Sequence, residues 1–428
     1  VPEDAGQVIL ANCSNMAVKN INASYTSVGI KLAYTEHSVV SNNSATNNYY
    51  GIELYSSSNN NIISNTANLN IVGIDLSSSL NNEITCNNVS SNHEGVHLRY
   101  QSSNNKITNN TANSNSVWGI YVYSSSNNKI TNNTANSNNW HGIVIVSSSN
   151  SNTLTENTAN SNNQTGIYLG YSSNNNIITG NNVSSNTEGI MISMSSDNIL
   201  TKNTISGNIY NFGVTGSGLS DFFHTIAVSN KVNGKPIQYL VGEKDMIIDL
   251  SWDVGYIGLV NSTNITVKDL MLTNNGQGIL FADVKNSLIE NVTTTNNQYG
   301  IYLCYSSNNK ITSNNVSNNG NDSERGFYGI SLGYSSNNLI YNNYFNDTYI
   351  ASDYGNNIWN ITKTFGTNII GGSYLGGNYW SVYAGEDLNG DGLGDTIVPF
   401  NSSGKIANGG DYLPLVKPTT PSFFDTGA

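Results

Sequence analysis

A short alternation of apolar and polar positions recurs along the chain and predicts β-strands. After Gly51, the aliphatic residues Ile52 and Leu54 flank the polar Glu53, a period of two that is typical of a strand with one buried face. The glycines that open this unit recur every 22–24 residues: Gly29, Gly51, Gly73, Gly95, Gly119, Gly142, Gly166 and Gly189, and the pattern resumes at Gly278, Gly300 and Gly329. No stretch has the 3.6-residue period of a helix, and Asn and Gly at this density oppose helices.

A repeat of about 23 residues with short strands and turns predicts one coil of a β-solenoid. The fold class expected is therefore all-β, a parallel β-helix with 22–24 residues per coil. Polar stretches such as SSNNKITNNTANSN (102–115) separate the strands, and Asn recurs at matching places that include Asn110, Asn133 and Asn182. Buried Asn side chains in consecutive coils can satisfy one another as a hydrogen-bonded column.

A larger duplication lies over the short repeat. GYIGLVNSTNITVKDLMLTNNGQG from Gly255 matches GQVILANCSNMAVKNINASYTSVG from Gly6 at an offset of 249 residues. We therefore predict two related modules, the first truncated at its N-terminus, and a C-terminal cap. Their expected bounds are 1–218, 219–375 and 376–428.

The amino-acid composition argues against nucleic-acid binding and against a membrane-spanning helix. The formal charge is -12, from 28 acidic against 16 basic residues, which argues against nucleic acid because phosphates need a basic face. No apolar run approaches the roughly 20 residues of a membrane-spanning helix.

Cysteines and sequons bear on the compartment. The three cysteines form no metal-type CxxC spacing and no disulfide framework, so we expect small apolar core residues, with a Cys13–Cys86 bridge as the alternative. Asn-x-Ser/Thr sequons suit an extracellular or cell-surface glycoprotein, although a chain rich in Asn, Ser and Thr also makes them by chance. The candidate glycosylation sites are Asn12, Asn88, Asn132, Asn182, Asn264, Asn315 and Asn401.

Three segments add a family resemblance to the repeats: VNGKPIQYLVGEKD (232–245), GGNYWSVYAGEDLNGDGLGDT (376–396) and DYLPLV (411–416). With the G-I-x-L…SSNN units, they resemble the right-handed parallel β-helix repeat proteins, and more narrowly the NosD-like repeat proteins of archaeal cell envelopes. The resemblance implies a three-faced, right-handed β-helix exported to the surface, in a family whose functions vary. A copper role needs clustered His, Met or Cys, and these residues are scattered here; the closest pair, His93 and His97, flanks a turn.

The strongest local motif is a calcium-type loop near the C-terminus. Its expected ligands are Asp387, Asn389, Asp391, the carbonyl of Leu393, and Asp395, oxygen donors at the alternate spacing of an EF-hand-type loop. Val398 stands where that loop has its bidentate Glu, so Asp411 or Glu386 would have to substitute. We expect a structural calcium ion; the alternative is a plain polar turn.

The residue two positions after each repeat glycine should point outward and form a column: Lys31, Glu53, Asp75, His97, Tyr121, Val144 and Tyr168. Glu53 and Asp75 would be adjacent, and carboxylates about 5 Å apart suit a retaining glycosidase. Alternatively they would hold calcium against a uronate, with Lys31 or Arg99 as the base, as in the β-helix pectate lyases that they resemble. The simplest interpretation is a solvated face of mutually compensating charges.

Tyrosines suggest a further surface. Tyr121, Tyr123 and Tyr168, with Tyr100 and Tyr171, should gather on one outer face, where flat rings can stack on sugars.

The leading functional hypothesis is a non-catalytic, calcium-stabilised structural protein of an envelope, sheath, filament or adhesive layer. Its partners would be copies of itself, assembled head-to-tail or laterally, or cell-surface glycans. The alternatives are a polysaccharide lyase or glycoside hydrolase and a glycan-binding β-helix.

Overall fold

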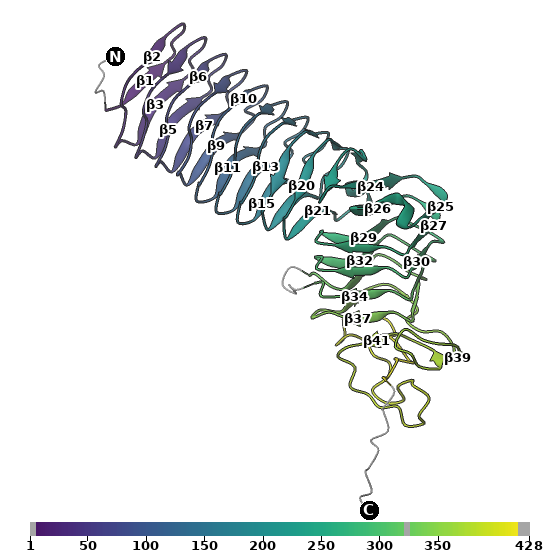
Figure 1. The fold of residues 1–428 in the computed structure, drawn as a ribbon. Coiled ribbons are helices and arrows are strands. Elements are labelled where there is room, and N and C mark those ends of the chain that lie inside the picture. The colour runs from purple at the N-terminus through teal and green to yellow at the C-terminus, as the bar shows by residue number, and fades with distance from the viewer. Residues whose placement is uncertain (1–5, 321–325, 418–428) are drawn as a thin grey trace, which may run out of the picture. The chain divides into compact units, whose positions relative to one another are not determined.

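The computed structural model describes residues 6–320 and 326–417. Within these residues the chain forms short β-strands and two single-turn 3-10 helices, Leu219–Phe222 and Leu250–Trp252. The chain divides into two compact units, Val1–Tyr239 and Leu240–Ala428. The predicted all-β parallel β-helix is confirmed (Figure 1). The three-part division into modules and cap stays a prediction.

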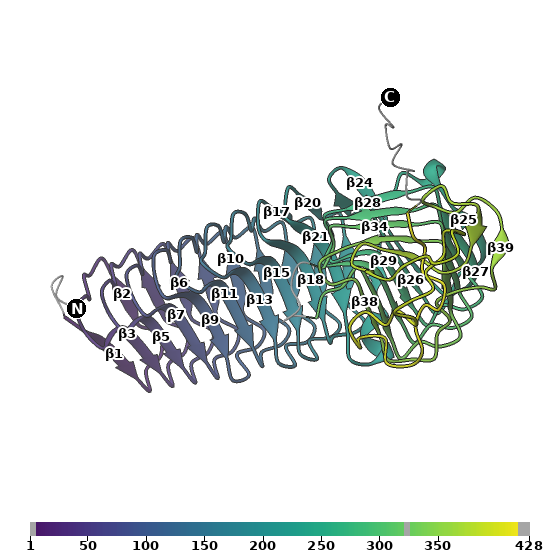
Figure 2. The same cartoon turned by 90° about the horizontal axis from the view of Figure 1, so that it is seen from below.

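Parallel sheets run along the N-terminal unit on different faces of the coil (Figure 2). The sheet that we call the face sheet contains β1 (Val8–Ala11), β3 (Val28–Ala33), β5 (Tyr50–Tyr55), β7 (Val72–Ser77), β9 (Glu94–Arg99), β11 (Trp118–Tyr123), β13 (His141–Val146), β15 (Thr165–Gly170), β18 (Glu188–Ser193) and β21 (Tyr210–Thr215). The second sheet contains β2 (Ala17–Lys19), β4 (Val39–Ser41), β6 (Asn61–Ile63), β8 (Glu83–Thr85), β10 (Lys106–Thr108), β12 (Lys129–Thr131), β14 (Thr153–Thr155), β16 (Ile177–Thr179), β19 (Ile199–Thr201) and β22 (Thr225–Ile226). A third side carries β17 (Asn182–Ser184), β20 (Thr204–Ser206) and β23 (Lys231–Val232), followed by β24 (Lys235–Val241).

Equivalent residues of successive coils pair in register. Ile52 pairs with Ile74, and Leu54 with Leu76, and all four have no exposed surface. The aliphatic positions of the repeat thus stack into continuous apolar columns inside the coil, which is the main source of favourable burial.

The repeat glycine is required by close packing between coils. A Cβ on Gly119 would lie 2.7 Å from the carbonyl oxygen of Gly142 and 2.8 Å from Nδ2 of Asn138. Any side chain here would push adjacent coils apart, so the periodic glycine reflects the spacing of the coils.

Buried asparagines form ladders along the N-terminal unit. The backbone N and Nδ2 of Asn133 both donate to Oδ1 of Asn157, at 2.9 and 3.0 Å, and its own Oδ1 accepts from Asn110. The predicted column is therefore confirmed for Asn110 and Asn133. It is wrong for Asn182, which is exposed; Asn181 occupies the ladder there.

The C-terminal unit repeats this plan with three parallel sheets. One contains β26 (Tyr256–Val260), β29 (Gln277–Ala282), β32 (Tyr299–Cys304), β35 (Ile330–Gly333) and β38 (Ala351–Asp353). Another contains β25 (Lys244–Ile248), β27 (Thr263–Lys268), β30 (Leu288–Glu290), β33 (Lys310–Thr312) and β36 (Leu339–Tyr341). The last contains β28 (Met271–Thr273), β31 (Thr293–Thr295), β34 (Asn315–Ser317), β37 (Tyr344–Asn346) and β41 (Tyr379–Trp380), and β39 (Thr364–Phe365) pairs antiparallel with β40 (Tyr374–Leu375).

Strand positions agree with the duplication. An offset of 249 residues carries β3 onto β29 and β5 onto β32 without a shift at either end of either strand. The internal match therefore extends from the sequence to the strand boundaries.

Three asparagine ladders in the C-terminal unit end on buried aspartates. Asn319 donates to Oδ1 of Asp347 at 2.6 Å. Asn357 donates to Oδ1 of Asp353 at 2.8 Å, and Asn378 donates its backbone N–H to Oδ2 of Asp411 at 2.7 Å. The indole N–H of Trp359 also binds Asp353, and that of Trp380 binds Asp411, which ties the ladder ends to an apolar cluster.

All three cysteines are free, so the alternative of a Cys13–Cys86 bridge is wrong. Cys304 is buried, as expected of a core residue, but Cys86 is exposed in a turn and Cys13 is partly exposed. The expectation of core cysteines therefore holds for Cys304 alone. The seven candidate glycosylation asparagines are all exposed, and their modification stays a prediction.

Candidate functional site

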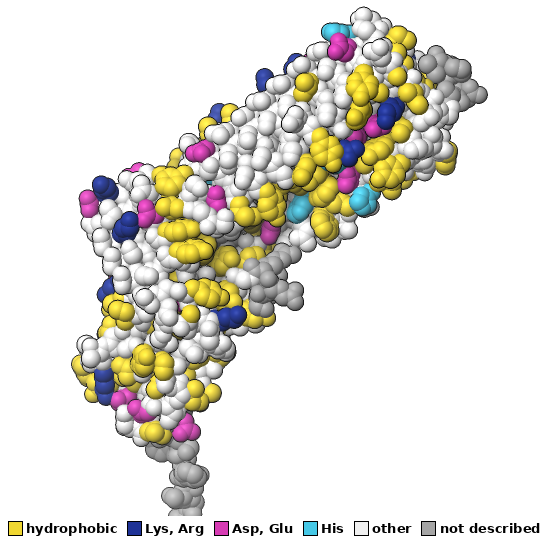
Figure 3. Space-filling model, turned by 180° about the vertical axis from the view of Figure 1, so that it is seen from behind, with side chains coloured by type: hydrophobic (Ala, Val, Ile, Leu, Met, Phe, Trp, Pro, Cys, Tyr) yellow, Lys and Arg dark blue, Asp and Glu magenta, His cyan; other side chains and the backbone are white. Residues whose placement is uncertain are grey.

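The outer surface of the face sheet in the N-terminal unit gathers charged, imidazole and aromatic side chains (Figure 3). They stand in three columns: the residue just before each repeat glycine, the residue two after it and the residue four after it. Register pairing places each column along successive coils, about 4.8 Å apart. This face, from β3 to β18, is the candidate site.

Two ion pairs occupy the end of the site nearer the N-terminus. Nζ of Lys31 lies 2.9 Å from Oε2 of Glu53, and Nε of Arg99 lies 3.0 Å from Oδ1 of Asp75. Glu53 and Asp75 are register partners on adjacent strands. The structure therefore brings together all four residues named for the enzyme alternative.

Burial dominates the electrostatics of this end. Asp75 has no exposed surface, and burial raises the pKa of its carboxyl to about 6, although Arg99 and His97 oppose the rise. The Arg99 guanidinium also donates from Nη2 to the Tyr50 hydroxyl at 3.1 Å. Desolvation lowers the pKa of Arg99, but the charges of Asp75 and Tyr50 raise it more, so that it stands above its ordinary value.

These contacts do not suit the proposed catalysis. A glycosidase acid must reach the glycosidic oxygen, but Asp75 is covered and Glu53 is only 7% exposed. Arg99 is held protonated by its partners and Lys31 is engaged by Glu53, so neither is placed as a base.

Aromatic rings continue the site along β11 to β15. Trp118 stacks on Tyr121 with ring centroids 4.0 Å apart, and His97 packs on Tyr121 at 4.9 Å. His141 stacks on Tyr168 at 5.8 Å. Such rings offer flat apolar area with polar edges, which suits sugars and other amphipathic ligands.

The predicted tyrosine strip is present in part. Tyr121 and Tyr123 lie 6.1 Å apart, but Val144 separates Tyr121 from Tyr168 in the column. Tyr100 and Tyr171 lie in the turns beyond the strands with positive φ, and each is more than half exposed. Val144 lies in the predicted column between Tyr121 and Tyr168, but it is only 3% exposed.

The column formed by the residues directly before the repeat glycines was not predicted from the sequence. The residues directly before a repeat glycine include Tyr50, Glu94, Trp118, His141 and Glu188. Glu94, Trp118 and His141 contact His97, Tyr121 and Tyr168 of the predicted column. Tyr50 contacts Arg99, and Glu188 contacts Thr165. Strict alternation would place the side chain of this residue inside the coil. The repeat glycine, however, packs closely against the next coil, and the side chain of the residue before it faces outward. The available signal was the polar or aromatic character of this position in successive repeats.

The calcium-type loop folds back on itself through its own backbone. Asp387 accepts from the N–H groups of Gly390, Asp391 and Gly392, at 2.8, 3.1 and 2.7 Å. Asn389 accepts from the N–H of Asp391, and Asp391 accepts from the N–H of Leu393.

Further contacts engage the other acidic residues of the loop. Asp395 accepts from the N–H of Leu388, and Lys363 binds Asp391. Both oxygens of Asp411, one of the two suggested substitute ligands, accept hydrogen bonds from Asn378, Trp380 and Leu413, and the calcium ligand set stays a prediction. Within residues 6–320 and 326–417, no three His, Cys, Asp or Glu residues are placed to hold a metal ion.

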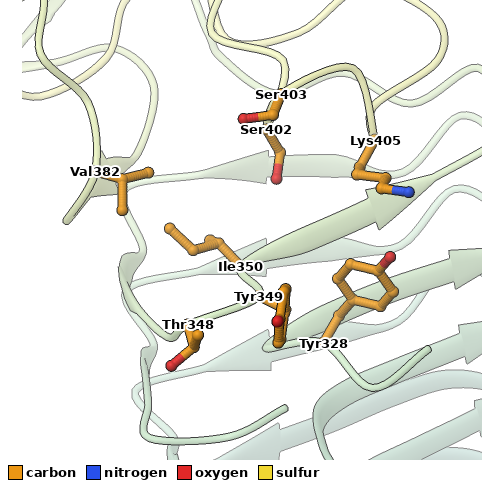
Figure 4. Close-up of a pocket in the computed structure, with 8 residues that line it drawn as sticks. All are labelled: Tyr328, Thr348, Tyr349, Ile350, Val382, Ser402, Ser403 and Lys405. Atoms are coloured by element: carbon orange, nitrogen blue, oxygen red, sulfur yellow. The ribbon is translucent and has the colours of Figure 1, made fainter. Parts of the chain in front are cut away.

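A pocket of about 490 Å³ opens in the C-terminal unit (Figure 4). Tyr328, Tyr349, Ile350 and Val382 supply apolar surface, and Lys405 stands at the edge beside two serines. None of the residues predicted from the sequence to form a site lines this pocket.

Stacked parallel strands, in-register asparagine ladders and a decorated outer face define a parallel β-solenoid with a candidate ligand-binding face. The chain belongs to the NosD family: the family model described as periplasmic copper-binding protein (NosD) matches residues 4–118, 100–242 and 245–385. No curated protein matches the chain in sequence.

Several solved structures are similar to this chain. The mannuronan C-5 epimerase AlgE6 A-module of Azotobacter vinelandii is 14% identical, covers 81% of this chain and 89% of its own, and has a TM-score of 0.38. The catalytic domain of a GH87 α-1,3-glucanase is 14% identical over 77% of this chain and 62% of its own, with a TM-score of 0.37. The periplasmic alginate epimerase AlgG is 14% identical over 79% and 80%, with a TM-score of 0.33.

The family description names copper, and the described residues do not fit a copper site. Copper sites gather imidazole, thiolate or thioether ligands. Nδ1 of His141 accepts from the N–H of Thr165, and Nδ1 of His224 accepts from the N–H of Asn198. The three cysteines are free and none is paired with a histidine in a metal-type cluster of the described chain. Among the described residues, no helix is long and apolar enough to cross a membrane.

Proposed function

We propose that this chain is a non-catalytic β-solenoid that works outside the cytoplasm and binds a glycan along its N-terminal face sheet. The observation that carries the proposal is the run of rings formed by Trp118, Tyr121, His141 and Tyr168 on consecutive strands. Rings repeated at the coil spacing match an extended chain of sugar units better than a compact ligand. The family description, which names periplasmic proteins, supports the location.

The ion pairs beside the rings support binding rather than catalysis. Asp75 and Glu53 are neutralised by Arg99 and Lys31, which holds the sheet surface rigid next to the rings. A preformed surface loses little conformational entropy when a ligand is bound. Regular coils over the length of the unit also suit the scaffold role expected from the sequence, and self-assembly remains a separate prediction.

The test is binding to an array of neutral, amino-sugar and uronate oligosaccharides. The intact protein should retain at least one class, and Trp118→Ala should weaken its binding by about tenfold or more, since stacked rings contribute about 0.5–1.5 kcal/mol beyond their buried area. Tyr25→Ala is the matched control, because Tyr25 is 84% exposed in the same unit but outside the site. Retention of no oligosaccharide, or equal loss in both variants, would overturn the proposal.

A further inference from the structure

Carboxylates outnumber cations on the candidate site. Among the described outward residues from β3 to β18 the acidic side chains are Glu53, Asp75, Glu94 and Glu188, and the Lys and Arg side chains are Lys31 and Arg99. Each cation is already bound to a carboxylate, at 2.9 Å for Lys31 and 3.0 Å for Arg99. A polyuronate or sulfated chain would therefore meet an excess of negative charge with both cations engaged.

The two remaining carboxylates stand at the two ends of the ring surface. Glu94 is on β9, directly before the strand of Trp118 and Tyr121, and its Oε2 lies 3.1 Å from Nδ1 of His97. Glu188 is on β18, directly after the strand of Tyr168, and its Oε2 accepts from the Thr165 hydroxyl at 2.7 Å. The rings thus lie between the two carboxylates along the sheet, with His97 between Glu94 and Tyr121.

Rings and carboxylates together recognise a particular chemistry. The face of an aromatic ring attracts a cation, and a carboxylate binds an ammonium group through a charge-assisted hydrogen bond. Neutral sugars would use the rings alone, and acidic sugars would be repelled. A sugar polymer that carries protonated amines would use both features.

We propose that the face-sheet site prefers amino-sugar glycans whose amines are free and protonated, such as deacetylated glucosamine oligomers, over neutral and acidic glycans. This inference rests on the proposed glycan-binding function and names its ligand class. Glu94 and Glu188 are the residues that set the preference, and the rings supply affinity common to all sugars. Because the attraction is between charges, added salt should weaken it.

The experiment compares three probes of equal length by titration calorimetry on the intact protein: glucosamine oligomers, N-acetylglucosamine oligomers and alginate oligomers, in mildly acidic buffer. We expect glucosamine oligomers to bind about tenfold more tightly than the acetylated ones, and the alginate oligomers to bind least. The double variant Glu94→Gln, Glu188→Gln should lose the preference, so that glucosamine and N-acetylglucosamine oligomers bind it equally. Glu83→Gln, an exposed acid of the neighbouring sheet, should behave as the unmodified protein.

The outcomes separate this inference from the proposed function. Equal affinity for the acetylated and deacetylated probes, or tighter binding of alginate, would overturn the amino-sugar preference and leave glycan binding in place. A preference that survives in the double variant would overturn the role of Glu94 and Glu188. Binding of none of the three probes would overturn both the preference and the glycan-binding function.

Discussion

Arg99 reaches across one coil to Asp75, placing its Nε 3.0 Å from a carboxylate that has no exposed surface. A second contact joins Nη2 to Oδ2 at 3.2 Å. The pair thus combines an ion pair with one hydrogen bond, and the Asp75 carboxylate is covered while the Arg99 side chain is 23% exposed. Such a pair is costly to break from one side, because the remaining charge is left buried.

Removing the guanidinium should therefore destabilise the N-terminal unit. We expect Arg99→Leu to lower the free energy of unfolding by about 3–5 kcal/mol, the usual cost of an unpaired buried charge. Lys106→Leu is the control, because the Lys106–Glu83 pair is exposed at both side chains and such pairs contribute about 0–1 kcal/mol. Urea unfolding monitored by circular dichroism measures both. Similar losses in the two variants would show that Asp75 is not desolvated.

Neighbouring asparagines should differ sharply in their contribution to stability. Asn181 lies in a ladder, where its amide donates to Asn203 and its oxygen accepts from Asn157, while Asn182 is exposed. Asn181→Ala should cost several kcal/mol, since each buried group left without a partner costs about 1–3 kcal/mol. Asn182→Ala should stay within about 0.5 kcal/mol of the unmodified protein. Thermal melts that rank the two variants equally would contradict the ladder.

Asp347 should make the C-terminal unit less stable as the pH rises. Burial raises the pKa of Asp347 to about 7, against hydrogen bonds from Asn319, whereas an unfolded Asp titrates near 3.9. The folded state therefore binds the extra proton between these values, and stability present below about pH 4 is lost as the pH rises through about 7.

Asp347→Asn keeps the accepting oxygen and removes this titration. Its stability relative to the unmodified protein should increase with pH and level off above about pH 7, as measured by urea unfolding across that range. A difference that does not change with pH would contradict the prediction.

His224 should act in the opposite sense in the N-terminal unit. Its Nδ1 accepts the N–H of Asn198 at the end of a ladder, and burial lowers its pKa to about 4, below the ordinary value of about 6.5. Stability contributed by the neutral ring is present above about pH 6.5 and is lost as the pH falls through about 4. His224→Asn should remove this acid sensitivity in melts between these values, whereas the exposed His93→Gln should preserve it.

The contacts within the calcium-type loop suggest which variants should change calcium binding. Lys363 binds the carboxylate of Asp391 and would compete with a cation for it. Calorimetry should therefore show calcium uptake by the intact protein that Asp391→Ala abolishes and Lys363→Met strengthens. Calcium should also raise the melting temperature, and Glu290→Gln, outside the loop, should respond normally. Absence of uptake in both the unmodified protein and Lys363→Met would contradict a calcium site.

Periodic features of the fold could be predicted because each coil repeats the same constraints. The pairs of aliphatic residues around Glu53 and Asp75 correctly indicate buried columns, and Gly29 to Gly189 mark the strands of the face sheet. The ladder at Asn110 and Asn133 follows from the same register.

Features that break the period could not be predicted in this way. Asn181 and Asn182 are adjacent residues of the same type. A shift of one residue in the turn decides which of the two side chains is buried. Glu53, Asp75, Lys31 and Arg99 were recognised as neighbours, but the burial of Asp75 depends on how Arg99 and Tyr50 fold over it. Trp118 and His141 were missed because the repeat glycine interrupts the alternation.

The asparagine ladders have a direction. In each pair the amide of the earlier coil donates to the oxygen of the later one, as from Asn133 to Asn157 and from Asn343 to Asn378. The amide of each further Asn again needs an acceptor in the next coil, so a column made only of asparagines leaves the last amide without one. The carboxylates of Asp347, Asp353 and Asp411 accept hydrogen bonds from the ladder asparagines and have no amide of their own to donate. Each of them therefore ends its ladder. The number of coils that stack in such a solenoid can thus be limited by one atom in each ladder. That atom is the carboxylate oxygen that aspartate has where asparagine has its amide nitrogen.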